Sequence, residues 1–341
     1  MKNGFSIERR LVGAWYADSP WLLLLAPLSW LFGYLAQKRR ARLQRRFQGR
    51  CYSVPVVVVG NISVGGSGKT PLVIALVKAL AEQGLKAGVV SRGYGGMTTD
   101  YPLSVRADTG ATESGDEPLL IARETAQFGC PVIVDPDRSR AVEYLLKTYS
   151  VDVVLTDDGL QHYRLHRDVE IVVVDAARGL GNQRLLPAGP LREPLQRLNE
   201  VDFVVANGVG DTAVDVDIQV KLQPKGFRNL ADGREIAPEQ WAEGSAVNAV
   251  AAIGHPQRFA ATLESLGLEV SLHPKDDHQP LEANDLSFDD MKPVIITAKD
   301  AVKLVDPVAD NLWVLDIEAS LPSQFVDQLL LRLKSFEGPG I

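Results

Sequence analysis

Residues 60–71, GNISVGGSGKTP, contain the residue types of a phosphate-binding loop. The glycines allow backbone N–H groups to turn toward an anion, a lysine there can reach the β- and γ-phosphates, and a threonine can reach Mg²⁺. The usual pattern, G-x-x-x-x-G-K-[ST], has glycine where this chain has Ser63. A β-branched run precedes the segment and a helical apolar pattern follows it, so the context predicts a nucleotide site despite this departure. The predicted nucleotide-binding residues are Gly65, Gly66, Ser67, Gly68, Lys69 and Thr70.

Two acidic pairs could serve such a site. Asp157 and Asp158 end an apolar run in LTDDGLQH, the position where phosphate-loop proteins hold Mg²⁺, although a helix cap followed by a turn is an alternative reading. The second pair lies in SGDEP, residues 114–118. By itself it could be a helix N-terminus, or it could supply a base, Asp116, and a metal neighbour, Glu117. The predicted metal-site residues are Thr70, Glu117, Asp157 and Asp158.

The elements that must hold these residues follow an α/β pattern. Short strands that are apolar on both faces alternate with helices, which indicates a mostly parallel sheet covered on both sides. Beyond about residue 210 a second series of strands and helices begins, and it suggests a smaller α/β unit. The predicted strands are 54–60, 86–93, 130–135, 151–159, 169–176 and 201–208, and the predicted helices are 69–84, 118–125 and 139–149. The predicted units are 1–50, an anchor segment, 51–215, the phosphate-loop unit, and 216–341, the smaller unit.

The N-terminal segment is both apolar and basic. Residues 21–36, WLLLLAPLSWLFGYLA, carry no charge, and residues 1–50 contain ten Lys or Arg against two acidic residues. The segment therefore carries a net charge of +8, and because the whole chain has −7, the remaining residues carry −15. An acidic body argues against a nucleic-acid partner. Sixteen helical residues cover roughly 24 Å, short of the ~20 residues of a spanning helix. We expect a helix that dips into a membrane or barely spans it, with a buried core helix as the alternative.

The composition is that of a folded protein. Of 341 residues, 45% are hydrophobic and 23% are charged, and the two cysteines, Cys51 and Cys130, do not form a metal-binding pattern. Two classes of phosphate-loop protein are disfavoured. Membrane-recycling ATPases carry a lysine where this chain has Val64, and the N-K-x-D base reader of GTPases is missing, with Asn207-Gly208 only a weak analogue.

Taken in order, the motifs of residues 60–303 resemble the tetraacyldisaccharide 4'-kinases, the lipid A 4'-kinases of Gram-negative bacteria. The stretches that carry the resemblance are GNISVGGSGKTP, SRGYGG, SGDEP, DDGLQH, GNQRLLPAGPLREP, IGHPQRF, DDHQ and TAKDAVK. The family pattern departs here at Gln279, where a second histidine is usual, at Ala298, where glutamate is usual, and at Ser67, where threonine is common. The N-terminal segment also looks like the membrane anchor of that family.

The resemblance implies a function and roles. It implies ATP and Mg²⁺ as cofactors and transfer of the γ-phosphate to the 4'-hydroxyl of a lipid A disaccharide 1-phosphate, at the cytoplasmic face of the inner membrane and without an obligate protein partner. It pairs Asp116 with His278 as catalytic residues, beside Lys69. The residues expected to contact the substrate are Arg92, Gln161, His162, Arg192 and Glu193, and Arg197 is a further candidate for gripping phosphate.

Two rival functions remain at this stage. One is a phosphate-loop kinase or ligase acting on another, soluble partner, and the other is a switch ATPase recruited to membranes. If residues 1–40 act only as an anchor, their deletion is expected to weaken liposome binding far more than ATP binding.

Overall fold

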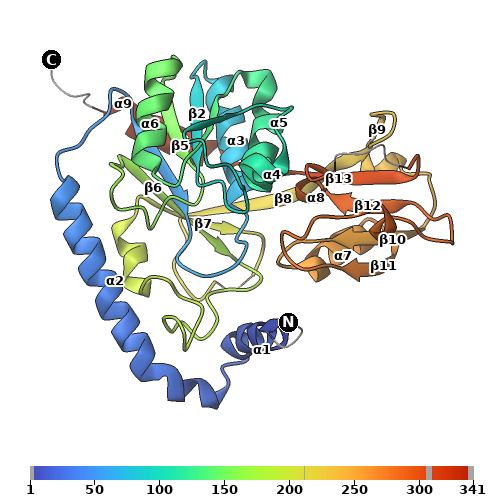
Figure 1. The fold of residues 1–341 in the computed structure, drawn as a ribbon, viewed down its shortest axis with the longest axis horizontal. Helices are drawn as coiled ribbons and strands as arrows, with labels where there is room; N and C mark the ends of the chain where they lie inside the picture. The colour runs from blue at the N-terminus through green and yellow to red at the C-terminus, as the bar shows by residue number, and fades with distance from the viewer. Residues whose placement is uncertain (1–3, 211, 305–308, 337–341) are drawn as a thin grey trace.

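The computed structural model describes residues 4–210, 212–304 and 309–336. Figure 1 shows two α/β units side by side and a helical N-terminal arm that runs along the left of the first unit and then below it. Their strands form a 13-stranded sheet in the order β11-β10-β12-β13-β8-β7-β6-β1-β5-β2-β4-β3, with β9 pairing to β8. A mostly parallel sheet with helices on both faces was the predicted fold class, and it is confirmed.

The first unit contains seven complete strands and most of the helices. Its strands are β1 Val56–Gly60, β2 Ala87–Ser91, β3 Leu103–Val105, β4 Val132–Val134, β5 Val153–Thr156, β6 Val169–Asp175 and β7 Phe203–Asn207. Its helices are α3 Lys69–Glu82, α4 Ala111–Ser114, α5 Asp116–Thr125 and α6 Arg138–Thr148. All neighbouring pairs in this part are parallel except β3 with β4.

Valine-rich strands form the centre of this unit because both faces of the sheet are covered. Every residue of β1, β2, β5 and β6 is buried. Helices α3 and α5 pack on one face and α6 packs on the other. The carboxyl ends of the parallel strands therefore meet at one edge, which is where ligands bind in open α/β sheets.

The second unit follows through one long strand, β8 Ile218–Asn229. Its first three residues pair in parallel with β7, and the rest pairs antiparallel with β13. The unit contains β9 Glu235–Ile236, β10 Ala246–Ala251, β11 Glu269–Pro274, β12 Val294–Thr297, β13 Leu312–Ser320, α7 Pro256–Ser265 and α8 Ala298–Ala301. The expected boundary at 215/216 thus falls just before a strand that both units share.

The C-terminal helix α9, Ser323–Lys334, corrects the expected extent of the second unit. Because β13 runs antiparallel to β8, it returns the chain to the first unit, where Phe325 and Leu329 are buried in the same core as residues of α3 and α5. The rings of Phe325 and Phe203 meet edge to face at 5.2 Å. The range 323–334 therefore belongs to the first unit and not to the second.

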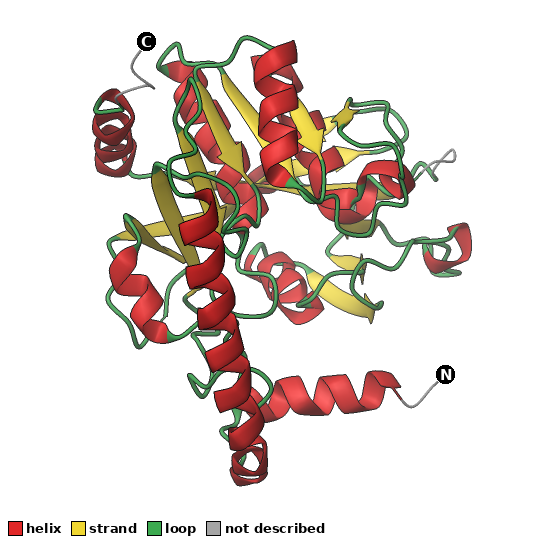
Figure 2. Cartoon of the chain, turned by 60° about the vertical axis from the view of Figure 1, so that its left-hand side comes forward, coloured by secondary structure: helices red, strands yellow, loops and turns green. Residues whose placement is uncertain are grey.

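The N-terminal arm consists of α1 Gly4–Tyr16, the 3-10 helix η1 Pro20–Leu25 and α2 Ala26–Phe47. Figure 2 shows α2 extending from the body and α1 lying across its lower end. Pro20–Phe47 is long and apolar enough, by length and composition alone, to cross a membrane, and only 17% of its most apolar window is buried. The alternative of a buried core helix is therefore wrong.

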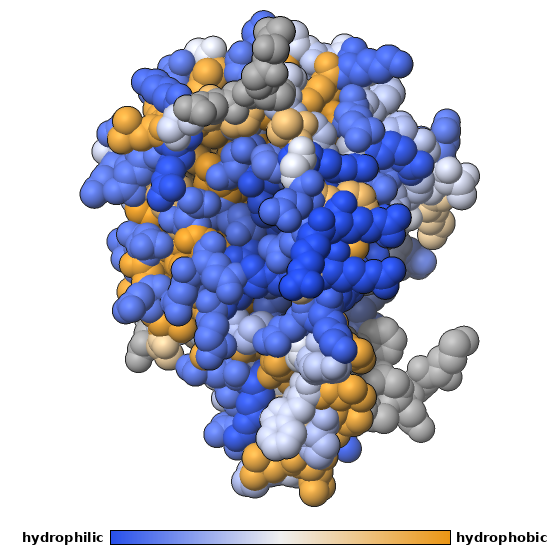
Figure 3. Space-filling view, turned by 90° about the vertical axis from the view of Figure 1, so that its left-hand side faces the viewer, coloured by the Kyte–Doolittle hydropathy of each residue, from blue (hydrophilic) through white to orange (hydrophobic). Residues whose placement is uncertain are grey.

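The exposed apolar side chains of the arm gather at its far end. Leu24 is 82% exposed and Trp30 is 79% exposed. Figure 3 shows apolar surface concentrated around this end and polar surface above it. Two contacts hold the same segment to the body: Ser29 donates to the Leu185 carbonyl at 2.9 Å and accepts from the Ala188 amide at 3.0 Å. The arm is thus attached on one side and apolar on the other.

Candidate active site

The phosphate-binding loop runs from the end of β1 to the start of α3. Gly65 and Gly68 have φ of 108° and 86°, a backbone region that other residues rarely adopt. A Cβ on Gly68 would also overlap the side chain of Asn207, whose Nδ2 donates to the Ser67 carbonyl at 3.0 Å. Asn207, at the end of β7, therefore holds the loop, which is a different role from the weak base-reader analogy considered for it.

Ser63 departs from the usual pattern at a position that needs no glycine. It forms an isolated antiparallel bridge with Leu191 and is not among the residues with positive φ. The loop entrance is fixed by two further bonds to the same segment, from Val64 N to Pro190 O at 2.9 Å and from Arg192 N to Ile62 O at 2.7 Å. The segment around 185–192 thus connects the loop to the N-terminal arm.

Asp157 lies directly after β5 and faces the loop. Its Oδ2 accepts from Thr70 Oγ1 at 3.2 Å, while its Oδ1 is buried without a hydrogen-bond partner. Burial and then the nearby charge of Glu117 raise the pKa of Asp157 to about 7. A buried carboxylate oxygen without a partner beside a threonine hydroxyl fits a divalent cation.

Asp158 has a different environment. It adopts φ 51°, and its carboxylate lies 3.5 Å from Lys69 Nζ and 3.6 Å from Arg192 Nη1. Burial opposes its ionisation, but Lys69 and Arg192 hold the pKa of Asp158 below its usual range. This carboxylate therefore pairs with Lys69 of the loop. A bound triphosphate would compete with Asp158 for that lysine.

The residues that the structure describes include no group of three His, Cys, Asp or Glu side chains that could enclose a metal. Phosphate-loop enzymes do not need one, because a hydroxyl, one carboxylate, waters and the phosphates complete the Mg²⁺ shell. Thr70 and Asp157 are already together. Glu117 points to Lys299 instead, with Oε1 3.0 Å from Nζ.

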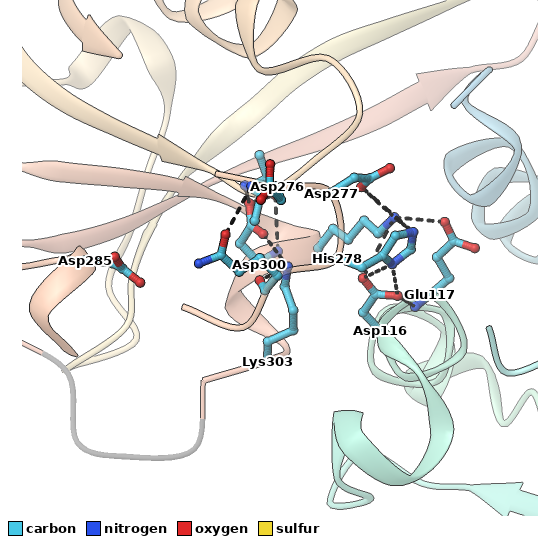
Figure 4. A network of polar contacts seen from close by, with 12 residues as sticks. Asp116, Glu117, Asp276, Asp277, His278, Asp285, Asp300 and Lys303 are labelled. Carbon is cyan, nitrogen blue, oxygen red and sulfur yellow. Dashed lines mark hydrogen bonds and ion pairs between the residues drawn. The ribbon is translucent and has the colours of Figure 1, made fainter. Parts of the chain in front are cut away.

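Asp116 and His278 come from different units and meet at the junction (Figure 4). Asp116 begins α5, and its Oδ2 lies 2.9 Å from His278 Nδ1. His278 has φ 62°, in a loop after β11. Gly115 precedes Asp116 with φ 89°, and a Cβ there would lie 2.5 Å from the Tyr94 carbonyl oxygen. The glycine of SGDEP thus permits the turn that presents the carboxylate.

Lys299, at the start of α8, completes this cluster. Its Nζ lies 3.4 Å from His278 Nε2 and 3.8 Å from Asp116 Oδ2. Because an ammonium only donates, Nε2 must accept, and Nδ1–H must donate to Asp116. Lys299 therefore favours one tautomer of the imidazole. Sequence reasoning quoted Lys299 within TAKDAVK but gave it no role.

The pKa of Asp116 is lowered and the pKa of His278 is raised by their contact. Burial opposes ionisation of Asp116, but the hydrogen bond from His278 and the charge of Lys299 hold the pKa of Asp116 below its usual range. The hydrogen bond to Asp116 raises the pKa of His278. Asp116 is consequently a carboxylate at neutral pH, which is the form that can accept a proton.

The five expected substrate residues lie in two different environments. Arg192 reaches Asp158 and Arg92 is exposed. Gln161 and Glu193, in contrast, bond to each other at 2.7 Å, and Glu193 is 5% exposed. Burial and then Arg138 lower the pKa of His162 to about 4, so this ring is neutral. Substrate contact by all five stays a prediction.

Arg197 is not available to grip phosphate, contrary to expectation. It is 1% exposed, and its guanidinium pairs with Glu170 and lies 3.4 Å from Glu193. The short helix that follows Pro194 turns this side chain inward. Arg197 therefore supports the buried carboxylates that order the 160s and 190s segments.

Tyr94 is a further residue that the sequence did not single out. Its ring packs edge to face on His278 at 5.2 Å between centroids, and its side chain is 63% exposed. The SRGYGG stretch is the signal in the sequence for an exposed aromatic beside the Asp116–His278 pair, because its glycines allow the turn.

Comparison with known proteins gives a consistent result. Residues 21–334 match the family model described as tetraacyldisaccharide-1-P 4'-kinase. The chain is 50% identical to a tetraacyldisaccharide 4'-kinase of Ectopseudomonas mendocina over 326 residues, covering 95% of this chain and 96% of that one. It is 49% identical to one of Alcanivorax borkumensis over 328 residues, covering 96% and 98%.

A solved structure has the same fold. The crystal structure described as the "apo" form of LpxK from Aquifex aeolicus in complex with ATP superposes with a TM-score of 0.75 at 28% identity. The match covers 92% of this chain and 99% of that one.

Proposed function

The chain belongs to the tetraacyldisaccharide 4'-kinase family and is an ATP-dependent kinase of lipid A biosynthesis, and on this premise we propose which of its residues carry out the reaction. The enzyme transfers the γ-phosphate of ATP to the 4'-hydroxyl of a tetraacyldisaccharide 1-phosphate. The single observation that supports the proposed roles most strongly is the Asp116–His278 pair, next to Glu117, whose charge acts on Asp157 at the phosphate-binding loop.

The loop binds the triphosphate. Backbone N–H groups of residues 65–70 and the N-terminus of α3 surround the phosphates, and Lys69 leaves Asp158 to neutralise the β- and γ-phosphates. Thr70 and Asp157 would hold Mg²⁺, with Asp158 and Glu117 as neighbouring carboxylates. When bound, the metal neutralises charge on the transferred group.

Asp116 accepts the proton of the attacking hydroxyl. His278 donates Nδ1–H to its carboxylate and so fixes its direction, while Lys299 keeps the imidazole in that tautomer. A sugar hydroxyl is a weak nucleophile, so alignment with the γ-phosphate and removal of its proton at the moment of transfer both lower the barrier. Arg92, Arg192, Gln161 and His162 are assigned to the acceptor, with Arg192 best supported because it lies beside Asp158, while the buried Glu193 acts by holding Gln161.

The N-terminal arm brings this site to the bilayer. The exposed end around Trp21, Leu24 and Trp30 enters the lipid, and the cationic run of residues 38–50 meets anionic headgroups at about 1 kcal/mol per charge. The acyl chains of the acceptor then stay in the membrane. We therefore propose that the enzyme works at the cytoplasmic face of the inner membrane, where ATP is available.

A direct assay tests the proposal. The full-length protein in detergent is incubated with γ-labelled ATP and a tetraacyldisaccharide 1-phosphate, and a labelled bis-phosphate is expected. Lys69→Ala should lose both ATP affinity and turnover. Normal turnover by Lys69→Ala, or phosphorylation only of soluble acceptors, would refute it.

A further inference from the structure

Arg178 lies against the phosphate-binding loop although it is distant from it in the sequence. It follows β6 in a turn that Asp175 fixes, with Oδ1 accepting from the amides of Ala177 at 3.1 Å and of Arg178 at 3.3 Å. A Cβ on Gly65 would lie 2.5 Å from Arg178 Nη1. The guanidinium therefore lies directly over the loop, at one of its two left-handed glycines.

In the part of the chain that the structure describes, no carboxylate neutralises the positive charge of the Arg178 guanidinium. Within residues 4–210, 212–304 and 309–336, no acidic side chain forms an ion pair with this guanidinium, and the nearby Asp175 pairs with Arg258. Other arginines nearby do have such partners: Arg192 pairs with Asp158, and Arg258 pairs with Asp175 at 2.9 Å. Arg178 instead stacks on the ring of Tyr16, 4.2 Å from its centroid. An aromatic face orients a cation but does not neutralise it.

Tyr16 is the last residue of α1, so this contact comes from the N-terminal arm. The neighbouring Trp15 is 5% exposed and donates Nε1–H to the Pro187 carbonyl at 3.0 Å, and its own carbonyl accepts from Asn182 N at 2.9 Å. The 182–192 segment in turn bonds to Val64 and Ile62 at the loop entrance. The end of α1 is therefore fixed relative to the loop.

We infer that Arg178 binds the phosphates of the nucleotide and that Tyr16 is a positioning residue that holds it there. An uncompensated guanidinium beside backbone N–H groups that bind an anion matches a phosphate group in charge and geometry. The N-terminal arm then completes the nucleotide site as well as attaching the enzyme to lipid. This inference rests on the proposed nucleotide site at Lys69 and Thr70, and it revises the expectation that removal of residues 1–40 weakens ATP binding far less than liposome binding.

The experiment measures the affinity of the full-length, detergent-solubilised protein for a fluorescent ATP analogue with Mg²⁺. Arg178→Met should weaken binding by about tenfold or more, because one charge-assisted hydrogen bond is lost. Arg178→Gln is a second variant that also removes the charge but has a polar side chain of different shape. Lys69→Ala serves as the reference. If Lys69→Ala weakens binding and both Arg178 variants stay within about twofold of the parent, the inference fails and the proposed site stands. If all three variants bind normally, the proposed site fails as well.

The role of Tyr16 has its own test. Tyr16→Leu should weaken ATP binding by about threefold, and Tyr16→Phe, which keeps the ring face, should restore it. Trp30→Ala changes an exposed aromatic elsewhere on the arm and should reduce liposome binding without changing ATP affinity. Equal ATP affinity of Tyr16→Leu and the parent would show that the stacking only attaches α1.

Discussion

The phosphate-binding loop is formed by one continuous stretch between β1 and α3, whereas Asp116 and His278 are 162 positions apart and belong to different units. The loop derives its shape from its own glycines and from its contacts with Asn207 and the 190–192 segment. The pair depends on how β8 and β13 place the second unit, and on Lys299 beneath the imidazole. Nucleotide binding and phosphate transfer should therefore respond to different substitutions.

The largest expected effect is on the pair. Asp116→Asn should lower kcat by about a thousandfold, because the amide cannot accept the hydroxyl proton, and leave ATP affinity within about twofold. Steady-state kinetics with the lipid acceptor and a binding titration measure the two separately. Glu239→Gln, at an exposed carboxylate of the second unit, is the matched control. Near-normal turnover would exclude Asp116 as the base.

The second largest effect concerns the packing of α9 in the core of the first unit. Phe325→Ala should lower the free energy of unfolding by about 3–5 kcal/mol, because it leaves a cavity where Phe325 is fully buried in the core of the first unit. Chemical denaturation followed by circular dichroism measures it. Leu331→Ala, on the same helix but 67% exposed, should change stability by less than about 1 kcal/mol. Equal losses of stability for Phe325→Ala and Leu331→Ala would show that α9 does not pack in the core.

The metal site should depend on pH through Asp157. Its pKa is raised to about 7 by burial and Glu117, so a proton competes with the cation below neutrality. Affinity should be about tenfold weaker at pH 6 than at pH 8, measured with Mn²⁺ by electron paramagnetic resonance in the nucleotide-free protein. Asp157→Asn should remove this dependence. The same affinity at both values would contradict a cation bound by Asp157.

The smallest effect tests the support of the loop. Asn207→Ala removes the bond to the Ser67 carbonyl and should weaken ATP binding by about fivefold, equivalent to ~1 kcal/mol. Turnover at saturating ATP should stay within about twofold, since the pair is untouched. A fall in kcat with unchanged ATP affinity would show that loop and pair are not independent.

Much of the first unit could be predicted because its strands and its phosphate-binding loop depend on residues that are adjacent in the sequence. Runs of valine between glycines predicted the buried strands, and Gly-Lys-Thr at a helix start predicted the loop. The SGDEP turn by itself suggested Asp116 as a candidate base, whereas its pairing with His278 came only from the resemblance to a family. The residue types at those positions gave no indication that they meet. The roles of Lys299 and Tyr94 were missed, and Asn207 was considered for a different role, because all three act through contacts with residues remote in the sequence.

The sequence by itself determined the backbone of the loop, the strands beneath it and the apolar character of the arm, because each depends on residues that are neighbours along the chain. The tertiary structure alone decided that α9 returns to the first unit, that Arg197 is buried and that Arg178 and Tyr16 meet above Gly65. These depend on the path of the chain through β8 and β13 and around the arm. No spacing in the sequence encodes that path, because it is the packing of whole elements that fixes which distant side chains come into contact.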